Sequence, residues 1–341
     1  MIPWSGPNAP LRNGRFVEVK DGLRFAWSGS ALAVHFRGTA VSVDASDKGG
    51  NHFLVLVDGK PKREKVILPS GRATVELVSG LPRGEHTVTL YRLNEPAVGE
   101  TTVHGFVLDA YGEALPTPTA PERRLEIIGD SISAGYGNEG PDEKCSFSPE
   151  TENHFLTYGA RASREVGAAL TTLAWSGRGV ASNRGSTTET ETMGVLWTRS
   201  LPADPASTWS FSSPAPDAVL INLGTNDFAP EVADIAPFGP AYAKLLDDVR
   251  ARYPRAQLLV ALGPALSDDF PPGRRALSTA REVLRGLVEE RTKAGDASVH
   301  FLEFARVRPE EGFGCDWHPS VATHTRMAGE LVGALRKHLG W

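Results

Sequence analysis

Three segments of the chain, far apart in the sequence, carry the residue types that acyl transfer requires. Ser131 lies in the segment Gly-Asp-Ser-Ile-Ser, directly after the apolar residues 125–128. Asn226 lies in Gly-Thr-Asn-Asp, and His318 lies in Asp-Trp-His-Pro. A serine hydroxyl can act as a nucleophile, an amide can donate to a developing oxyanion, and an imidazole can act as a base. Together these residues predict a serine esterase.

Ser131 is the expected nucleophile because it follows a short apolar run that ends in a turn of small residues. Such a run is typical of a buried strand, and the turn presents the next side chain at the edge of the sheet. The helix expected after it would supply free N–H groups at its N-terminus. An N-cap serine gives the same local pattern. The G-x-S-x-G elbow is absent, so the α/β-hydrolase topology is not indicated.

Two further segments are candidates for stabilising an oxyanion. Asn226 follows the apolar residues 218–223, an expected strand that would hold its amide rigidly, as preorganised stabilisation requires. An Asx turn after a strand is the structural alternative. Gly177, in Trp-Ser-Gly-Arg-Gly, is expected to offer a backbone N–H to the same site, and Gly179 is an alternative donor. Glycine lets the chain turn there and leaves room for a substrate.

His318 is the expected general base, and its neighbours distinguish it from the other histidines among the nine in the chain. Asp316 precedes it, and Pro319 follows at the expected first turn of a helix. The Asp316 carboxylate could accept the Nδ1 proton, which is the usual third role in such a site. A structural role near a helix start is the alternative for a lone histidine.

The second part of the chain alternates strands and helices. The apolar strand candidates are residues 125–128, 173–175, 218–223, 258–262 and 299–304. Helical spacing is clearest for Tyr242, Leu245, Leu246 and Val249. This alternation predicts an α/β domain with a parallel sheet. Because ligands bind beyond the carboxyl ends of the strands in such sheets, we expect the segments around Ser131, Gly177 and Asn226 to converge at one edge.

Residues 1–112 show a period of two and no helical spacing. Leu32, Val34 and Phe36 alternate with other residues, and the hairpin-type dipeptide Asp58-Gly59 follows another such run. Short strands separated by Gly, Pro and Asp predict an all-β domain of the β-sandwich or jelly-roll type. Residues 113–121 contain three prolines, which predicts an extended linker to an α/β domain at residues 122–341.

The bulk properties exclude some classes of function. A net charge of −5 over 341 residues gives no basic surface for nucleic acid. No apolar run approaches the ~18 residues of a membrane span, and no signal peptide is found at the start. The sequence therefore predicts a protein that stays inside the cell or has lost its leader. Its two cysteines, Cys145 and Cys315, are either free thiols or a disulfide.

Two patterns that suggest a cofactor or a metal are set aside. Residues 135–140 spell G-x-G-x-x-G, but they do not directly follow a strand and no helical pattern follows them, as a dinucleotide site requires. His318 and His324 lack the spacing of zinc ligands, and H-E-x-x-H is absent. No cofactor and no metal ion are expected.

The segments at 129–133, 177, 224–227 and 316–319 resemble the sequence blocks of SGNH/GDSL hydrolases. The resemblance is closer to carbohydrate esterase family 2, the acetyl esterases of plant cell-wall polysaccharides, and the segments at 145–153 and 221–228 strengthen it. It covers essentially the whole chain. It implies a flavodoxin-like SGNH hydrolase domain with a parallel sheet, preceded by a jelly-roll-like β-sandwich.

Position by position, the resemblance implies that Ser131 is the nucleophile and His318 the base. It makes the oxyanion hole from the N–H groups of Ser131 and Gly177 and the amide of Asn226. The implied reaction is the removal of O-acetyl groups from xylan- or mannan-type polysaccharides or oligosaccharides through an acyl-enzyme, in a secreted or periplasmic setting. The alternatives are a general short-chain GDSL esterase or lipase, and a carbohydrate-binding protein with a vestigial hydrolase site.

One position departs from the wider superfamily. Its aspartate stands three residues before the histidine, where this chain has Cys315. Asp316 matches the closer family, in which a backbone carbonyl is the alternative partner of the imidazole. Trp317, beside the base, is expected to stack against a sugar, with ordinary packing as the alternative.

Overall fold

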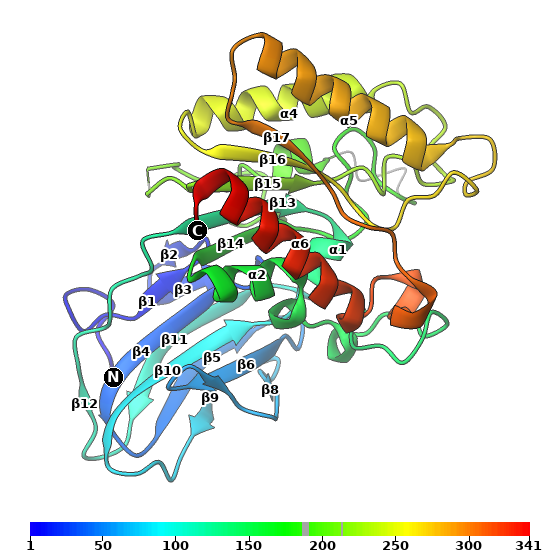
Figure 1. Cartoon of the computed structure of the whole chain (residues 1–341). Helices are drawn as coiled ribbons and strands as arrows, with labels where there is room; N and C mark the ends of the chain where they lie inside the picture. Colours follow the sequence, from blue (N-terminus) through cyan, green and yellow to red (C-terminus); the bar gives the residue numbers. More distant parts are fainter. Residues whose placement is uncertain (186–190, 213) are drawn as a thin grey trace. The chain divides into compact units, whose positions relative to one another are not determined.

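The computed structural model describes residues 1–185, 191–212 and 214–341. The chain separates into two compact units (Figure 1). The first consists of Met1–Pro121 with Ser200–Thr208, and the second of Glu122–Arg199 with Trp209–Trp341. The proline-rich segment begins with a short strand, β12 (Glu113–Ala114), that pairs with a strand of the first unit. The division of the sequence into domains at this segment stays a prediction.

The first unit is all-β, with two antiparallel sheets. One sheet has the order β1 (Leu11–Asn13), β4 (Ala31–Gly38), β10 (Gly84–Arg92), β6 (His52–Val57) and β7 (Lys60–Pro61), with β12 beside β4 and β8 (Val66–Ile67) beside β6. The other has the order β2 (Val17–Val19), β3 (Gly22–Phe25), β11 (Thr101–Leu108), β5 (Val41–Asp47) and β9 (Gly71–Val78). A 3₁₀ turn, Pro96–Val98, precedes β11.

The two sheets form a β-sandwich because each turns an apolar face inward. Val34 and Phe36 on β4 and Val41 and Val43 on β5 belong to one buried core cluster. The residues between them in the sequence are more exposed, as the period of two predicts. The expected all-β architecture of this part of the chain is confirmed.

The second unit contains a parallel five-stranded sheet. Its order is β14 (Ala169–Ala174), β13 (Arg124–Gly129), β15 (Ala218–Asn222), β16 (Gln257–Leu262) and β17 (Val299–Glu303). This is the order 2-1-3-4-5 of flavodoxin-like sheets. The predicted α/β class is therefore confirmed. One strand differs in length, since β14 begins at Ala169, whereas the apolar run predicted only residues 173–175. As an edge strand, β14 accommodates the polar Thr171 and Thr172 that interrupt its apolar pattern.

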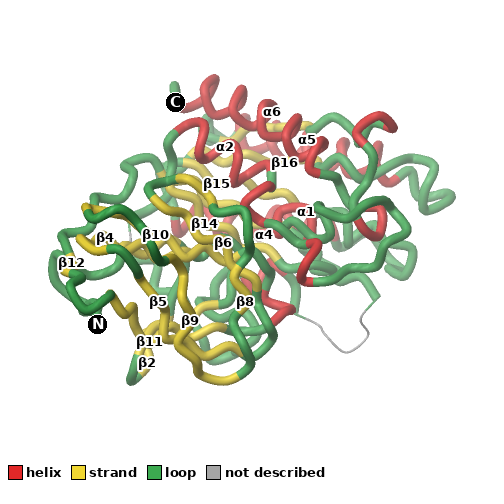
Figure 2. The backbone as a smooth tube through the Cα atoms, turned by 90° about the horizontal axis from the view of Figure 1, so that it is seen from below, coloured by secondary structure: helices red, strands yellow, loops and turns green. Residues whose placement is uncertain are grey.

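Helices cover both faces of this sheet. The helices are α1 (Ser131–Ala134), α2 (Tyr158–Val166), α3 (Met193–Leu196), α4 (Phe238–Arg252), α5 (Ala276–Lys293) and α6 (Val321–Leu339). The 3₁₀ turns are Pro149–Thr151, His154–Leu156, Pro309–Glu311 and Cys315–Trp317. Helices α2 and α6 lie side by side and share a core with β13 and β15 (Figure 1 and Figure 2). Helices α4 and α5 cover the other face, where α5 packs on β16 and β17 (Figure 1).

Within the described part of the chain, no helix combines the length and the apolar character needed to cross a bilayer.

The carboxyl edge of the parallel sheet collects the segments singled out above. Strand β13 ends at Gly129, and α1 begins two residues later at Ser131. The turn is tight, because a Cβ added at Gly129 would lie 2.1 Å from the Ser133 Oγ. Asn226 follows β15, and His318 lies just before α6. The connections of the fold thus bring distant parts of the chain to one edge.

Candidate active site

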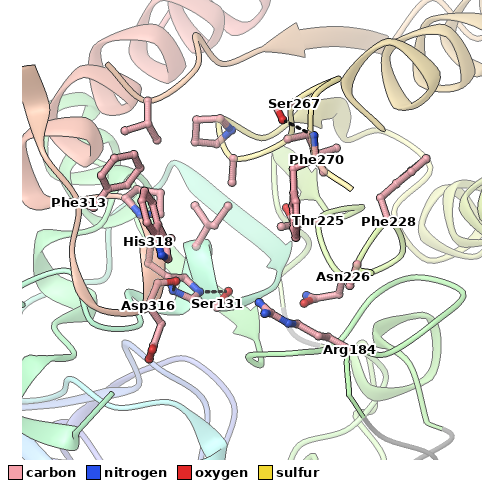
Figure 3. Close-up of a pocket in the computed structure, with 18 of the residues that line it drawn as sticks. Ser131, Arg184, Thr225, Asn226, Phe228, Ser267, Phe270, Phe313, Asp316 and His318 are labelled. Carbon is pink, nitrogen blue, oxygen red and sulfur yellow. Dashed lines mark hydrogen bonds between the residues drawn. The ribbon is translucent and has the colours of Figure 1, made fainter. Parts of the chain in front are cut away.

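Ser131 and His318 form a hydrogen-bonded pair. The Ser131 Oγ lies 2.9 Å from the His318 Nε2, although 187 residues separate them in the sequence (Figure 3). Ser131 is the first residue of α1, and the Asp130 side chain caps that helix by accepting the Ile132 N–H at 3.0 Å. The nucleophile candidate is therefore fixed by a helix start and sits within proton-transfer distance of a base.

Two backbone carbonyls orient the His318 ring. Its Nδ1 lies 3.1 Å from the Cys315 oxygen and 3.1 Å from the Asp316 backbone oxygen. A carbonyl can only accept, so Nδ1 carries the proton and Nε2 is free to accept one from Ser131. Asp316 and Trp317 have φ angles of 51° and 63°, in the left-handed region. These two residues turn the backbone so that its carbonyls face the ring, a strained arrangement of the kind found at functional sites.

The Asp316 carboxylate does not contact the imidazole. It accepts the Tyr136 hydroxyl at 2.9 Å and the Phe147 N–H at 3.0 Å. The sequence left open whether the Asp316 carboxylate or a backbone carbonyl is the partner of the imidazole Nδ1. The geometry matches the backbone carbonyl. The left-handed turn at Asp316 directs its carbonyl, not its side chain, to Nδ1. A catalytic role for the carboxylate stays a prediction.

The surroundings of His318 favour the neutral imidazole at neutral pH. Burial lowers the pKa of His318 from its ordinary value to about 4. The two backbone carbonyls and the Asp316 charge raise the pKa, and the charge of Arg184 lowers it. A general base must be unprotonated to take a proton, so this environment favours the form that Ser131 needs.

A disulfide holds the turn that carries His318. Cys145 and Cys315 are bonded, with their Cα atoms 4.6 Å apart. The Asp316 N–H also donates to the Cys145 oxygen at 3.0 Å, and the Cys315 N–H donates to the Gly137 oxygen at 2.9 Å. The carbonyl that orients the imidazole is thus part of a segment fixed by one covalent bond and two backbone hydrogen bonds.

Tyr136 is a residue of this site that the sequence did not reveal. Its ring lies 4.2 Å from the His318 ring and 4.3 Å from the Phe147 ring, measured between centroids. It lies in the G-x-G-x-x-G pattern that was set aside, and Gly137 in the same pattern accepts from Cys315. A glycine-flanked tyrosine five residues after the nucleophile was the available signal. Its contacts with Asp316 and His318 come from a segment about 180 residues away, which local pattern cannot show.

The candidate oxyanion donors differ in whether they already donate a hydrogen bond within the protein. Asn226 uses one amide proton to donate to the Arg178 oxygen at 3.0 Å, which leaves its second proton for a ligand. The Gly179 N–H donates to the Asn183 Oδ1 at 3.3 Å, so Gly177 is the better donor of the two. Gly177 has a φ of 77°, and the nearest atom to a Cβ added there would be 3.9 Å away. Ser131 and Asn226 line the pocket, whereas Gly177 is not among its lining residues.

Asp227, the last residue of Gly-Thr-Asn-Asp, anchors the loop that carries the glycines. Its carboxylate accepts the N–H groups of Val180, Ala181 and Ser182 at 3.0, 2.7 and 2.9 Å. Burial raises the pKa of Asp227, and these three donors lower it. No sequence pattern indicated a role for this residue, because its partners lie more than 40 residues upstream.

A pocket of about 690 Å³ opens over Ser131 and His318 (Figure 3). This volume lies in the usual range for small-ligand sites. Trp317 and Phe270 line it and are 65% and 62% exposed. The Trp317 ring lies edge-on to the Phe313 ring, with centroids 5.2 Å apart, and its exposure leaves the indole available for a ligand to stack on.

The described residues contain no group of three His, Cys, Asp or Glu side chains arranged to hold a metal ion. The serine, the imidazole and the amide donors are nevertheless sufficient for acyl transfer through a covalent intermediate.

Two families match the chain, one for each part. Residues 12–118 match the family described as Carbohydrate esterase 2 N-terminal. Residues 127–326 match the GDSL-like Lipase/Acylhydrolase family.

Similar proteins cover nearly the full chain. "Cellulase/esterase CelE" of Acetivibrio thermocellus is 38% identical over 332 residues, which are 97% of this chain but 40% of that protein, so the chain spans less than half of its length. An "Acetylxylan esterase / glucomannan deacetylase" of Cellvibrio japonicus is 24% identical over 100% of this chain and 91% of its own. A solved family two carbohydrate esterase from Clostridium thermocellum, in complex with cellohexaose, has a TM-score of 0.92 and 37% identity, covering 98% of this chain and 100% of that one.

Proposed function

The chain belongs to the carbohydrate esterase 2 family, and we propose that it is a serine esterase that removes O-acetyl groups from plant cell-wall polysaccharides or their oligosaccharides. The observation that carries this proposal is the 2.9 Å hydrogen bond between the Ser131 Oγ and the His318 Nε2. The acetylxylan esterase / glucomannan deacetylase among its relatives supports acetylated xylan or mannan as the substrate class.

In the first half of the reaction, the Ser131 Oγ attacks the acetyl carbonyl carbon while its proton moves to the His318 Nε2. The carbonyl oxygen becomes an oxyanion. The second amide proton of Asn226 and the N–H groups of Ser131 and Gly177 are the proposed donors to it. When the intermediate collapses, the bond to the sugar oxygen breaks and the imidazolium returns the proton to that oxygen. The deacetylated sugar leaves, and Ser131 remains acetylated.

In the second half, a water molecule replaces the sugar. His318 takes a proton from the water as it attacks the acetyl-enzyme, and returns that proton to the Ser131 Oγ when the bond between Oγ and the acetyl carbon breaks. Acetate leaves and the free enzyme is restored. The carbonyls of Cys315 and Asp316 accept from Nδ1 throughout, so they stabilise the imidazolium that forms in each half.

The exposed face of Trp317 is the proposed platform for the sugar. A tryptophan ring offers a flat apolar surface, and this ring lines the pocket beside the base. The disulfide at Cys145 and Cys315 supports a second proposal about setting, namely that the protein works in an oxidising compartment outside the cytoplasm.

Two measurements test the function. The wild type should release acetate from acetylated xylo- and manno-oligosaccharides and from 4-nitrophenyl acetate, and should cleave 4-nitrophenyl octanoate far more slowly. Ser131→Ala should form no acetyl-enzyme detectable by mass spectrometry and should lose activity on every ester. Full activity in that variant would disprove the proposal. Comparable rates on the octanoyl ester would instead identify a general GDSL esterase or lipase.

A further inference from the structure

We infer that the pocket selects acetylated saccharides that also carry a carboxylate, as uronic acid units do, and that Arg184 binds this carboxylate. The inference rests on the proposed esterase function and specifies the substrate class of the same site. It concerns a residue that the reaction itself does not use, in the loop between β14 and α3.

Arg184 presents an exposed guanidinium to the reacting atoms. It lines the pocket together with Ser131 and Asn226, and Figure 3 shows its side chain extending toward Ser131 from the side where Asn226 lies. Its charge reaches the base, since it lowers the pKa of His318. In the described part of the chain, no side chain forms a salt bridge or hydrogen bond with its guanidinium.

The backbone that carries Arg184 is held in place. The Arg184 N–H donates to the Gly177 oxygen at 2.8 Å. The preceding residues are tied to the buried carboxylate of Asp227 by three hydrogen bonds, and the Asn183 side chain donates to the Glu191 oxygen at 3.0 Å. A cation on a fixed backbone loses less freedom on binding a ligand than one on a free loop.

The other charges of the pocket leave Arg184 available. The charged lining residues are Arg184, Arg306 and Asp316. The two arginines outnumber the single carboxylate, and the Asp316 carboxylate is engaged by Tyr136 and Phe147 rather than by Arg184. The pocket is therefore locally positive in a chain whose net charge is −5. The bulk charge repels an anionic polysaccharide, and a cation at the site is what would offset that repulsion.

A carboxylate is the ligand that matches this arrangement. A guanidinium offers a planar fork of N–H donors that can bind both oxygens of a carboxylate. Neutral sugar hydroxyls have no need of a full positive charge. A rival role for Arg184 is to stabilise the oxyanion, and the two roles predict different kinetics. Binding of a substrate carboxylate affects charged substrates alone, whereas oxyanion stabilisation affects every ester.

The test compares two substrates that differ only in charge. One is an acetylated xylo-oligosaccharide with a glucuronic acid side group, and the other is the same compound with its carboxylate converted to the primary amide. We expect wild-type kcat/KM to be about tenfold higher for the substrate with the carboxylate than for its amide, mainly because KM is lower. A tenfold ratio is the effect expected of one charge-assisted contact. This preference should shrink as salt is raised from 0.05 to about 0.5 M, because exposed charges are screened.

Variants of Arg184 test whether this residue causes the preference for the carboxylate substrate. Arg184→Gln should reduce the ratio of the two kcat/KM values to about one, and Arg184→Lys should retain part of it. The matched control is Arg336→Gln, which removes an exposed arginine of α6 whose partner is Glu165, outside the pocket. It should keep the tenfold ratio.

Three outcomes would overturn the inference. The wild type could cleave both substrates equally, Arg184→Gln could keep the preference, or Arg184→Gln could lose kcat equally on both substrates and on 4-nitrophenyl acetate. The last result would assign Arg184 to the oxyanion. If no acetyl ester were cleaved by the wild type, the proposed function itself would fail, which is a separate result.

Discussion

The two loops that face each other across Ser131 are held in different ways. The turn at 315–318, which carries the base, is fixed by a disulfide, two backbone hydrogen bonds and the contacts of Tyr136. The loop at 177–184, which carries the proposed oxyanion donor and Arg184, depends on the Asp227 carboxylate for three of its hydrogen bonds. The base is therefore secured by several independent contacts, whereas on the oxyanion side three of the contacts converge on a single buried carboxylate.

The largest effect is expected where the oxyanion side meets the substrate. Asn226→Ala removes an amide donor, and we expect kcat to fall by about 10²–10³ with KM nearly unchanged. Steady-state kinetics on 4-nitrophenyl acetate and an acetylated oligosaccharide would show this. A loss below tenfold would mean that the oxyanion is stabilised elsewhere. The melting temperature, measured in parallel, separates a catalytic loss from an unfolded protein.

A smaller effect is expected from loosening the loop without touching its donors. Asp227→Asn places an amide where three N–H groups need an acceptor, and the amide nitrogen cannot accept. We expect kcat to fall about tenfold and the free energy of unfolding to fall by about 2 kcal/mol.

The control for this variant is Asp296→Asn. Asp296 precedes the amino end of β17 and pairs with Arg250. That variant should lose stability but keep kcat. If both variants kept kcat, the loop would not depend on Asp227 for its catalytic geometry.

The pH dependence of kcat/KM should reflect the lowered pKa of His318. Because the pKa of His318 is lowered to about 4, kcat/KM should hold its value below pH 6.5 and fall only near pH 4. A pH profile with its acid limb at 6.5 would contradict a neutral, half-buried base.

The stability of the fold should also depend on pH, through the histidines that it buries. His154 and His324 are also buried, and burial lowers the pKa of each to about 3. The unfolded chain therefore takes up protons first as pH falls below about 6.5. Stability present above that pH is lost progressively down to about pH 3, which melting curves at several pH values would show.

The smallest effect is expected at the residue that a conventional triad would make essential. Asp316→Asn should lower kcat/KM by less than about fivefold, because backbone carbonyls orient the imidazole and the new side chain still offers an oxygen to Tyr136 and Phe147. His318→Ala should lose far more. A loss near 10⁴ for Asp316→Asn is the size expected of a triad aspartate and would contradict the carbonyl assignment.

Much of the fold could be predicted because its signals are local. The apolar residues 218–223 and 258–262 are long enough to identify buried strands, and alternation with helices predicts a parallel sheet. The edge strand β14 was predicted too short, because Thr171 and Thr172 interrupt its apolar run. Thr172 is nevertheless buried, with its hydroxyl 2.9 Å from the His154 Nε2. The meeting of Ser131 with His318 could be expected from the rule that parallel strands deliver their loops to one edge.

The rest of the site depends on contacts that local pattern does not encode. Tyr136 and Phe147 contact the side chains of Asp316 and His318, which lie 169 or more residues away. Asp227 accepts from backbone N–H groups 45 to 47 residues upstream. The partner of Nδ1 is a carbonyl, which every residue has, so no residue type signals it. The left-handed turn at Asp316 and Trp317 selects that carbonyl. Aspartate is enriched in left-handed conformations but tryptophan is not, so the pair of residue types does not predict this turn.

The disulfide also keeps the two fragments of the chain joined after a protease cuts between the cysteines. Ser131 precedes Cys145 and His318 follows Cys315, and the two cysteines are 170 residues apart. A single cut at any peptide bond between them leaves one fragment with the serine and one with the histidine, and the sulfur bridge still joins the two fragments. A nicked molecule would therefore run as one band on a non-reducing gel and as two bands after reduction.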